Sequence, residues 1–462
     1  MEQTGYIVAI EVGSSRCSGI VGKRNSDGNI HVLSYVTEPS SSFIKKGVVF
    51  NIDKTAMCLT NIINRLEGES DMTVSKVYVG LGGKSMHTVS NLVARTFDEE
   101  TKVTQTLIDA MNDENLETVY PDQEIVLAVP QEYKLDNSFN IDPVGVISKS
   151  VEGRYRNVVA SLALKRRLHD CLNNAKVDDA FYLISPVCLA DAVLPDLDKR
   201  SGCVLVDFGA DTTTVSIYKN NILRSLVVLP IGGSNITHDL SLILKIDEDE
   251  AEELKLKYGE VVPQIDGSEE AGEKIKIPTT GNEIDKSYLD DIVSARAEEI
   301  VANVWNVIQQ SGYESQLFSG IFVTGGASNL PGLMDMLEKT CKRMRVRRAR
   351  NVWSLMMQDC VSPVDESTIS DTLLALLLAG KESCCTRSTL SDGNLFDHSE
   401  VEVQQPAEPE QPAVNPPAEE HKSEDENSGR KKDTNQKKKN KNSTFDRLVK
   451  KLFGEEENTT DQ

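Results

Sequence analysis

Short apolar stretches rich in β-branched residues alternate along most of the chain with longer stretches of helical periodicity. Three of the apolar stretches have the length and composition of buried strands, residues 6–10, 203–206 and 320–323. The residue pattern predicts helices at residues 53–66, 165–174, 235–244 and 248–257, a long amphipathic helix at 288–311 and an apolar helix at 370–378. Strands and helices that alternate over 462 residues predict an α/β fold with two lobes.

The pattern changes character at about residues 85–165 and again near the end of the chain. In the first of these regions we expect an acidic helix at 104–112 and strands at 124–130, 145–150 and 157–164. Past about residue 386 the composition turns to Pro, Glu, Gln, Asn and Lys, which cannot bury enough apolar surface to become ordered.

Apolar residues return after this polar stretch with spacing i, i+3, i+4, i+7 and i+8, which predicts an amphipathic helix over residues 443–454. The apolar stripe consists of Phe445, Leu448, Val449, Leu452 and Phe453. The cations beside it are Arg447, Lys450 and Lys451. Cations beside an apolar face suit an anionic bilayer surface. The alternative is a helix docked on its own domain, which the long polar linker disfavours.

The formal charge of −22 argues against general nucleic-acid binding, because phosphate would be repelled overall. No stretch approaches the roughly 18 apolar residues of a membrane-spanning helix, and no signal peptide is recognisable. The nine cysteines show no C-x-x-C spacing. A reduced, cytoplasmic protein is the natural interpretation.

Each of the three predicted buried strands is followed by a loop rich in glycine and hydroxyl residues, at residues 11–15, 207–213 and 324–327. Backbone N–H groups and hydroxyls in such a loop can bind an anion, and an acid at its mouth can hold a cation. A single loop of this kind is as often an ordinary turn as a binding loop. The three in this order resemble the phosphate-1, phosphate-2 and adenosine motifs of the actin/heat-shock-chaperone ATPase superfamily.

Within that superfamily, residues 126–135, 143–145, 230–239 and 251–259, together with the terminal helix, resemble the FtsA family of bacterial division proteins. The resemblance implies an actin-like, two-lobed, duplicated ATPase fold with an inserted FtsA-type small subdomain, then a disordered linker and a C-terminal amphipathic helix. The implied divisions are 1–84 and 166–201 for the first lobe, 85–165 for the insert, 202–385 for the second lobe, 386–442 for the linker, 443–454 for the helix and 455–462 for an acidic tail.

The resemblance also implies a site for ATP and Mg²⁺ between the lobes. The residues that would contact nucleotide are Gly13, Ser14, Ser15, Arg16, Asp207, Gly209, Thr212, Glu252, Lys255, Gly325, Gly326 and Ala327. Glu11 and Asp207 would hold Mg²⁺, through water in the case of Asp207. The alternatives are a plain turn for each glycine and a solvated ion pair for Glu252 and Lys255.

Three positions depart from the superfamily pattern. Glu11 stands where Asp is usual, and the pair Ala210–Asp211 replaces a usual Gly–Gly, which places a charge near the phosphates. Ser185 stands where relatives with clear ATPase activity carry a Glu before Pro, and a serine is a poor general base at neutral pH. We therefore expect at most a slow ATPase, with nucleotide acting as a structural or switching ligand.

By resemblance, the protein would polymerise like actin and tether FtsZ filaments to the inner face of the cytoplasmic membrane at the division septum, helping to recruit later division proteins. The FtsZ tail would dock on Arg296, Glu299 and Asn303 of the helix at 288–311, although a solvated face explains these residues equally well. One alternative is a pilus-assembly relative, expected to lack the lysine-rich linker and amphipathic tail. Another is an ATPase or sugar-kinase-like enzyme of the same fold, which would need a carboxylate base.

Overall fold

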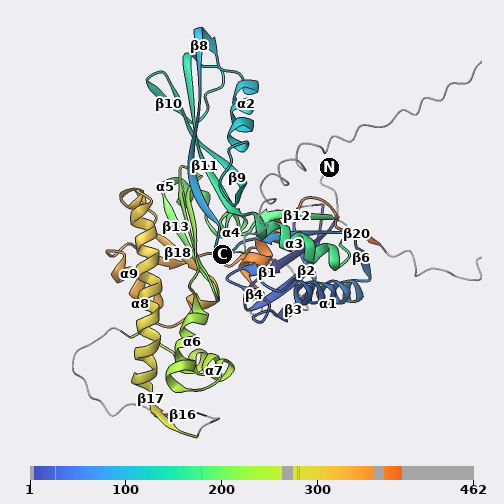
Figure 1. Ribbon diagram of the computed structural model, residues 1–462, viewed down its shortest axis with the longest axis vertical. Coiled ribbons are helices and arrows are strands. Elements are labelled where there is room, and N and C mark those ends of the chain that lie inside the picture. Colours follow the sequence, from blue (N-terminus) through green and yellow to red (C-terminus); the bar gives the residue numbers. More distant parts are fainter. Residues whose placement is uncertain are drawn as a thin grey trace, which may run out of the picture. The chain divides into compact units, whose positions relative to one another are not determined.

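Two sheets built on one plan form the two lobes (Figure 1). The computed structural model describes residues 5–26, 28–177, 179–262, 274–277, 279, 281–356 and 369–387. The first sheet has the order β12-β7-β1-β2-β3. Its strands are β1 (Gly5–Val12), β2 (Arg16–Arg24), β3 (Ile30–Pro39), β7 (Lys76–Leu81) and β12 (Asp179–Ile184). β1, β2 and β3 form an antiparallel meander, whereas β7 and β12 continue the sheet in parallel on the other side of β1.

The second sheet repeats this arrangement in the order β15-β14-β13-β18-β19. Its strands are β13 (Cys203–Phe208), β14 (Thr213–Lys219), β15 (Ile222–Leu229), β18 (Ile321–Thr324) and β19 (Val346–Arg348). Again three strands form an antiparallel meander and two continue in parallel. The middle strands are buried on both faces, which explains why they read as continuous apolar runs without alternation.

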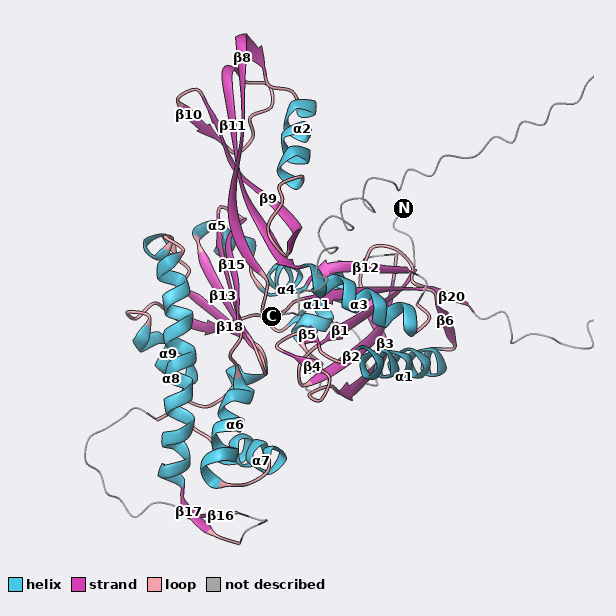
Figure 2. Cartoon of the chain, viewed as in Figure 1, coloured by secondary structure: helices cyan, strands magenta, loops and turns pink. Residues whose placement is uncertain are grey.

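Helices pack on both sheets (Figure 2). Most buried apolar residues of the lobes form two clusters, and the first of these also includes residues of the second sheet, such as Leu205, Leu226 and Phe322. In the first lobe the helices are α1 (Ile52–Ser70), α3 (Leu162–Asn174), α4 (Ser185–Val193), α10 (Val352–Met356) and α11 (Asp371–Ala379), whereas the short α5 (Asp196–Ser201) contacts β14 of the second sheet. In the second lobe they are α6 (Gly233–Leu244), α7 (Glu248–Tyr258), α8 (Lys286–Gln310) and α9 (Leu333–Thr340). Short pairs complete the described part: β4 (Ile44–Lys45) with β5 (Val48–Val49), β6 (Met72–Val74) with β20 (Cys385–Arg387), and β16 (Lys274–Lys276) with β17 (Glu283–Asp285).

An additional unit lies between β7 and α3 and has a small core of its own. Its elements are β8 (His87–Lys102), α2 (Gln105–Leu116), β9 (Gln123–Leu135), β10 (Ser138–Asn140) and β11 (Ile147–Ser161). The chain enters this unit from the first lobe, yet β8 pairs with β15 through His87 and Val227. The unit therefore extends the sheet of the second lobe to nine strands (Figure 1).

The strands expected at 145–150 and 157–164 are wrong in detail, because one strand, β11, covers most of both. It also ends three residues earlier than expected. The Ser161 hydroxyl accepts a hydrogen bond from the Ala163 amide at 3.3 Å and so caps helix α3, which begins at Leu162. The six helices that the residue pattern predicts are all present, with ends that shift by a few residues. Within the described ranges, no helix is long and apolar enough to cross a membrane.

Candidate functional site

The loops after β1 and β13 have the same hydrogen-bonded form. The Gly13 amide donates to the Arg16 carbonyl at 3.1 Å, and the Gly209 amide donates to the Thr212 carbonyl at 2.9 Å. A Cβ atom at Gly13 would lie 2.7 Å from the Arg16 oxygen, and one at Gly209 would lie 2.8 Å from the Thr212 oxygen. Both loops therefore require glycine at their first position, and the duplication of the sheets extends to these turns.

The third loop follows β18, which lies beside β13 in parallel. Gly325 has φ +87, and a Cβ atom there would lie 2.5 Å from the carbonyl oxygen of Phe208. Only glycine allows this close approach to the second loop. The 3₁₀ turn that follows, Gly326–Asn329, contributes Gly326, Ala327 and Asn329 to the lining of the same space.

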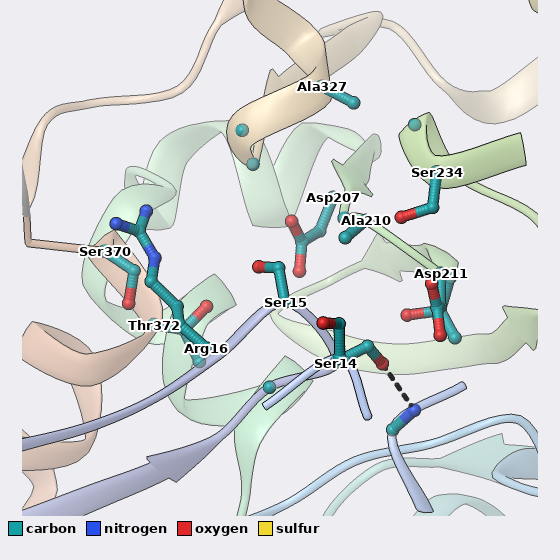
Figure 3. A pocket seen from close by; sticks show the side chains of 18 of the residues that line it. Ser14, Ser15, Arg16, Asp207, Ala210, Asp211, Ser234, Ala327, Ser370 and Thr372 are labelled. Atoms are coloured by element: carbon teal, nitrogen blue, oxygen red, sulfur yellow. Dashed lines mark hydrogen bonds between the residues drawn. The ribbon is translucent and has the colours of Figure 1, made fainter. Parts of the chain in front are cut away.

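These three loops line one pocket of about 640 Å³ between the lobes (Figure 3). The pocket is lined by Glu11 and by every residue that the sequence resemblance assigns to nucleotide, namely Gly13, Ser14, Ser15, Arg16, Asp207, Gly209, Thr212, Glu252, Lys255, Gly325, Gly326 and Ala327. Residues from both ends and the middle of the chain thus converge on one cavity. Its volume falls within the range of small-molecule and cofactor sites.

The second-lobe wall of the pocket holds a hydrogen-bonded cluster on α6 and α7. The Lys255 ammonium donates to Glu252 at 2.5 Å and to the Thr237 hydroxyl at 2.9 Å. It also donates to the Gly233 carbonyl at 3.3 Å. The Lys255 side chain is only 11% exposed, so it is a fixed cation in the wall of the pocket.

The carboxylates of Glu11 and Asp371 lie close enough to Asp207 to repel its negative charge. Burial raises the pKa of Glu11, while the hydroxyl of Ser370 and the charge of Arg16 oppose this effect. Burial, together with the charges of Glu11 and Asp371, raises the pKa of Asp207 to about 7. A divalent cation would relieve both the burial and the mutual repulsion of these acids. Within the described ranges, however, no group of three or more His, Cys, Asp or Glu residues is arranged to hold a metal alone, so a bound cation would need oxygen ligands from another source, such as phosphate.

The start of α11 supplies pocket residues that the sequence resemblance did not assign. Ser370 donates a hydrogen bond to Glu11, and Thr372 lines the pocket. Asp371 accepts hydrogen bonds from the Thr324 hydroxyl at 3.2 Å and the Val352 amide at 3.0 Å. The detectable signal is the Ser-Asp-Thr sequence at the start of an apolar helix, which has a hydroxyl and acid composition like that of the loops.

Ser185 also lines the pocket, as the first residue of α4. It follows β12, the strand of the first sheet that is parallel to β7. Pro186 beside it is suited to the first turn of a helix, which fixes the backbone direction at this point.

The proposed docking residues lie on α8, away from the pocket. Arg296 forms a paired interaction with Asp239 of α6, with distances of 2.6 and 3.0 Å, and a third bond to Glu299. The side-chain amide of Asn303 donates to the backbone carbonyl of Glu299 at 2.8 Å. The three residues are neighbours along one helix, and Arg296 is also part of the contact between α6 and α8.

The apolar and basic residues of the terminal helix, from Phe445 to Phe453, lie outside the described residues.

Residues 204–369 match the family model for cell division protein FtsA. Cell division protein FtsA of Porphyromonas gingivalis is 27% identical over 402 residues, which is 86% of this chain and 83% of that protein. Cell division protein FtsA of Neisseria meningitidis serogroup B is 29% identical over 346 residues, which is 73% of this chain and 82% of that protein.

Along most of its length the chain is therefore similar to cell division protein FtsA, and part of its second half matches the model of that family. The fold predicted from the sequence, an actin-like two-lobed α/β fold, is confirmed. A solved structure of a PilM–PilN type IV pilus biogenesis complex superimposes with a TM-score of 0.54 over 80% of this chain and 97% of that one. At a sequence identity of 14%, this likeness shows a common fold alone.

Proposed function

We propose that this protein binds an adenine nucleotide with Mg²⁺ between its lobes and serves as a polymerising adaptor that connects FtsZ filaments to the membrane during division. The observation that carries the nucleotide part is the single pocket in which both duplicated loops, the glycine turn after β18 and the Lys255 cluster meet. Similarity to cell division protein FtsA over most of the chain supports the adaptor part.

In this proposal each wall of the pocket has a separate task. The amides and hydroxyls of the loops at 13–16 and 209–212 bind the phosphates, because closely spaced N–H groups favour anions. Glu252 and Lys255 contact the ribose or base, and the turn at 325–327 covers the adenosine. Mg²⁺, held near Glu11 and Asp207 and by the phosphates, would neutralise phosphate charge.

Turnover is expected to be slow. Ser185 occupies the place along the chain where a carboxylate would position and activate water, and a hydroxyl has little basicity at neutral pH. The nucleotide then serves mainly to fix the relative position of the lobes. In the same proposal, the face of α8 that carries Arg296, Glu299 and Asn303 binds the FtsZ tail. The amphipathic segment 443–454 binds the inner leaflet as a peripheral anchor.

Titration of the full-length protein with a fluorescent adenine nucleotide, with and without Mg²⁺, tests the site. Asp207→Asn is expected to weaken binding in the presence of Mg²⁺ much more than in its absence, since a neutral amide is a poorer partner for the cation. Asp98→Asn removes the same charge from an exposed position of β8 and serves as the matched control. Equal binding by all three proteins would overturn the assignment of the site.

Flotation with anionic vesicles tests the adaptor part. Full-length protein is expected to carry FtsZ to the vesicles, and protein without residues 443–462 is expected to leave both in solution. A pilus-assembly function predicts no FtsZ in the floating fraction, and a kinase-like function predicts rapid nucleotide turnover, so each alternative has its own outcome.

A further inference from the structure

A two-residue turn between β4 and β5 donates its backbone amides to the side chains of both duplicated loops. Lys46 and Gly47 form the turn, with φ angles of +53 and +70, as in the tight hairpins that match strand twist. The Gly47 amide donates to the Ser14 hydroxyl at 2.9 Å, the contact drawn as a dashed line in Figure 3. The Lys46 amide donates to the Asp211 carboxylate at 3.0 Å. The first contact stays within one lobe, whereas the second joins the two lobes.

The turn itself is held firmly. The Lys46 carbonyl accepts the Lys84 amide at 3.0 Å. A Cβ atom at Gly47 would lie 2.8 Å from the Cα atom of Gly83, so the two backbones are in close contact. The Lys46 N–H is therefore a preoriented donor at the edge of the pocket, of the kind that phosphate oxygens use.

The acceptor for the Lys46 amide, Asp211, differs in charge from the equivalent residue of the first loop. Asp211 is the third residue of its loop, and the equivalent residue of the first loop is Ser15. Both side chains line the pocket. A hydroxyl at this position can donate to a phosphate oxygen, but a carboxylate can only accept and adds a negative charge.

We infer that Asp211 disfavours the terminal phosphate of a triphosphate, so that this site prefers a nucleoside diphosphate. The inference rests on the proposed nucleotide site. A γ-phosphate would compete with the carboxylate for the Lys46 amide and would meet its charge, whereas the shorter diphosphate leaves the bond between the lobes intact. Asp211 thus determines specificity. Its hydrogen bond with the Lys46 amide also holds the two lobes together around the diphosphate.

Two substitutions separate charge from hydrogen bonding. Asp211→Asn removes the charge and keeps an acceptor for the Lys46 amide, whereas Asp211→Gly removes both. The affinities for ADP and for a non-hydrolysable ATP analogue are measured by calorimetry on the full-length protein at fixed Mg²⁺. The ratio of the two affinities is the readout, because it cancels general effects on the pocket.

The unsubstituted protein is expected to bind ADP more tightly than the ATP analogue. Asp211→Asn is expected to shift this ratio by about tenfold toward the triphosphate, since juxtaposed like charges oppose binding strongly. Asp249→Asn, a carboxylate that lines the same pocket from α7, is the matched control and is expected to leave the ratio unchanged. In hydrogen exchange of the nucleotide-free protein, the Lys46 amide is expected to exchange faster in Asp211→Gly than in Asp211→Asn.

An unchanged affinity ratio in Asp211→Asn, with both nucleotides still binding, overturns this inference and leaves the nucleotide site standing. Equal exchange of the Lys46 amide in all variants overturns the closing role. Failure of the unsubstituted protein to bind either nucleotide overturns the proposed function, and the selectivity with it.

Discussion

The hydroxyl of Ser370 donates a hydrogen bond to the carboxylate of Glu11, so the start of α11 contacts the end of β1 although 359 positions of sequence separate them. The same hydroxyl accepts the Leu373 amide at 3.1 Å and caps the helix. The Ser370 side chain therefore both caps helix α11 and binds an acidic residue of the pocket.

Replacement of Ser370 by alanine is expected to lower the free energy of unfolding by about 1 kcal/mol, the typical cost of a lost helix cap. It is also expected to raise the pKa of Glu11 further, because the hydroxyl bond favours the charged carboxylate. Mg²⁺ should then be needed at higher concentration for nucleotide binding. Ser370→Thr retains the hydroxyl and should restore both properties. A Mg²⁺ requirement that is the same in both variants would show that Ser370 acts on the helix alone.

Nucleotide binding in the presence of Mg²⁺ is expected to strengthen as the pH rises toward 7 and then to level off. The pKa of Asp207 is raised to about 7, and the cation needs the ionised form. Stability of the nucleotide-free protein should change in the opposite direction. Between pH values of about 3.8 and 7 the folded state holds a proton on Asp207 that the unfolded state has lost, so this group's contribution to the free energy of unfolding falls as pH rises.

The slope of that contribution is at most about 1.4 kcal/mol per pH unit. Denaturant titrations across this pH range, with Asp207→Asn as the reference, isolate it as a difference between the two proteins. Identical pH profiles for binding by both proteins would contradict the assignment of Asp207.

Arg296→Glu is expected to weaken binding of an FtsZ tail peptide and also to destabilise the second lobe. The second effect follows from the paired contact with Asp239, because charge-assisted hydrogen bonds contribute about 1.5–3 kcal/mol. Thermal unfolding of the double variant Arg296→Glu/Asp239→Arg separates the two effects. The double variant should recover stability and remain defective in peptide binding. Recovery of peptide binding as well would mean that Arg296 supports the helix pair and does not touch the FtsZ tail.

The terminal segment is expected to act as a reversible membrane anchor. Leu448→Glu or Phe453→Glu should abolish flotation with anionic vesicles, because each places a charge in the apolar stripe. Lys450→Gln should only weaken flotation and reduce its salt dependence, since one cation contributes about 1 kcal/mol at an anionic surface. Flotation of Leu448→Glu at physiological salt would rule out the anchor.

The sequence predicts the local parts of this structure well, because they depend on neighbouring residues. The strand before Gly13 and the strand before Gly209 each end in a glycine turn, and the same short-range pattern marks both. The ion pair of Glu252 and Lys255 follows from their spacing on one helix. The bond from Thr237 to Glu252 depends on how α6 meets α7, which no local pattern encodes.

Contacts made by distant segments explain what sequence reasoning missed. The role of Ser370 becomes visible only when α11 packs beside β1, and the acceptor for Lys46 only when the lobes face each other. The additional unit is another case. Its strands are recognisable, but the pairing of His87 with Val227 depends on a sheet edge that lies about 140 positions further along the chain.

That pairing has a mechanical consequence. In addition to this pairing, the Leu226 amide donates to the Thr88 hydroxyl at 3.1 Å, and Arg224 donates to Gln131 at 3.0 Å. These contacts attach the base of the unit to β15. The unit is joined covalently to the first lobe only by the two short crossings at 82–86 and 161–162. A rotation of one lobe against the other would have to bend these crossings and to shift β9 and β11 against the apolar core on which Val126, Leu127 and Val158 pack. A change of angle between the lobes would therefore also move the far end of β8 and β11 (Figure 1).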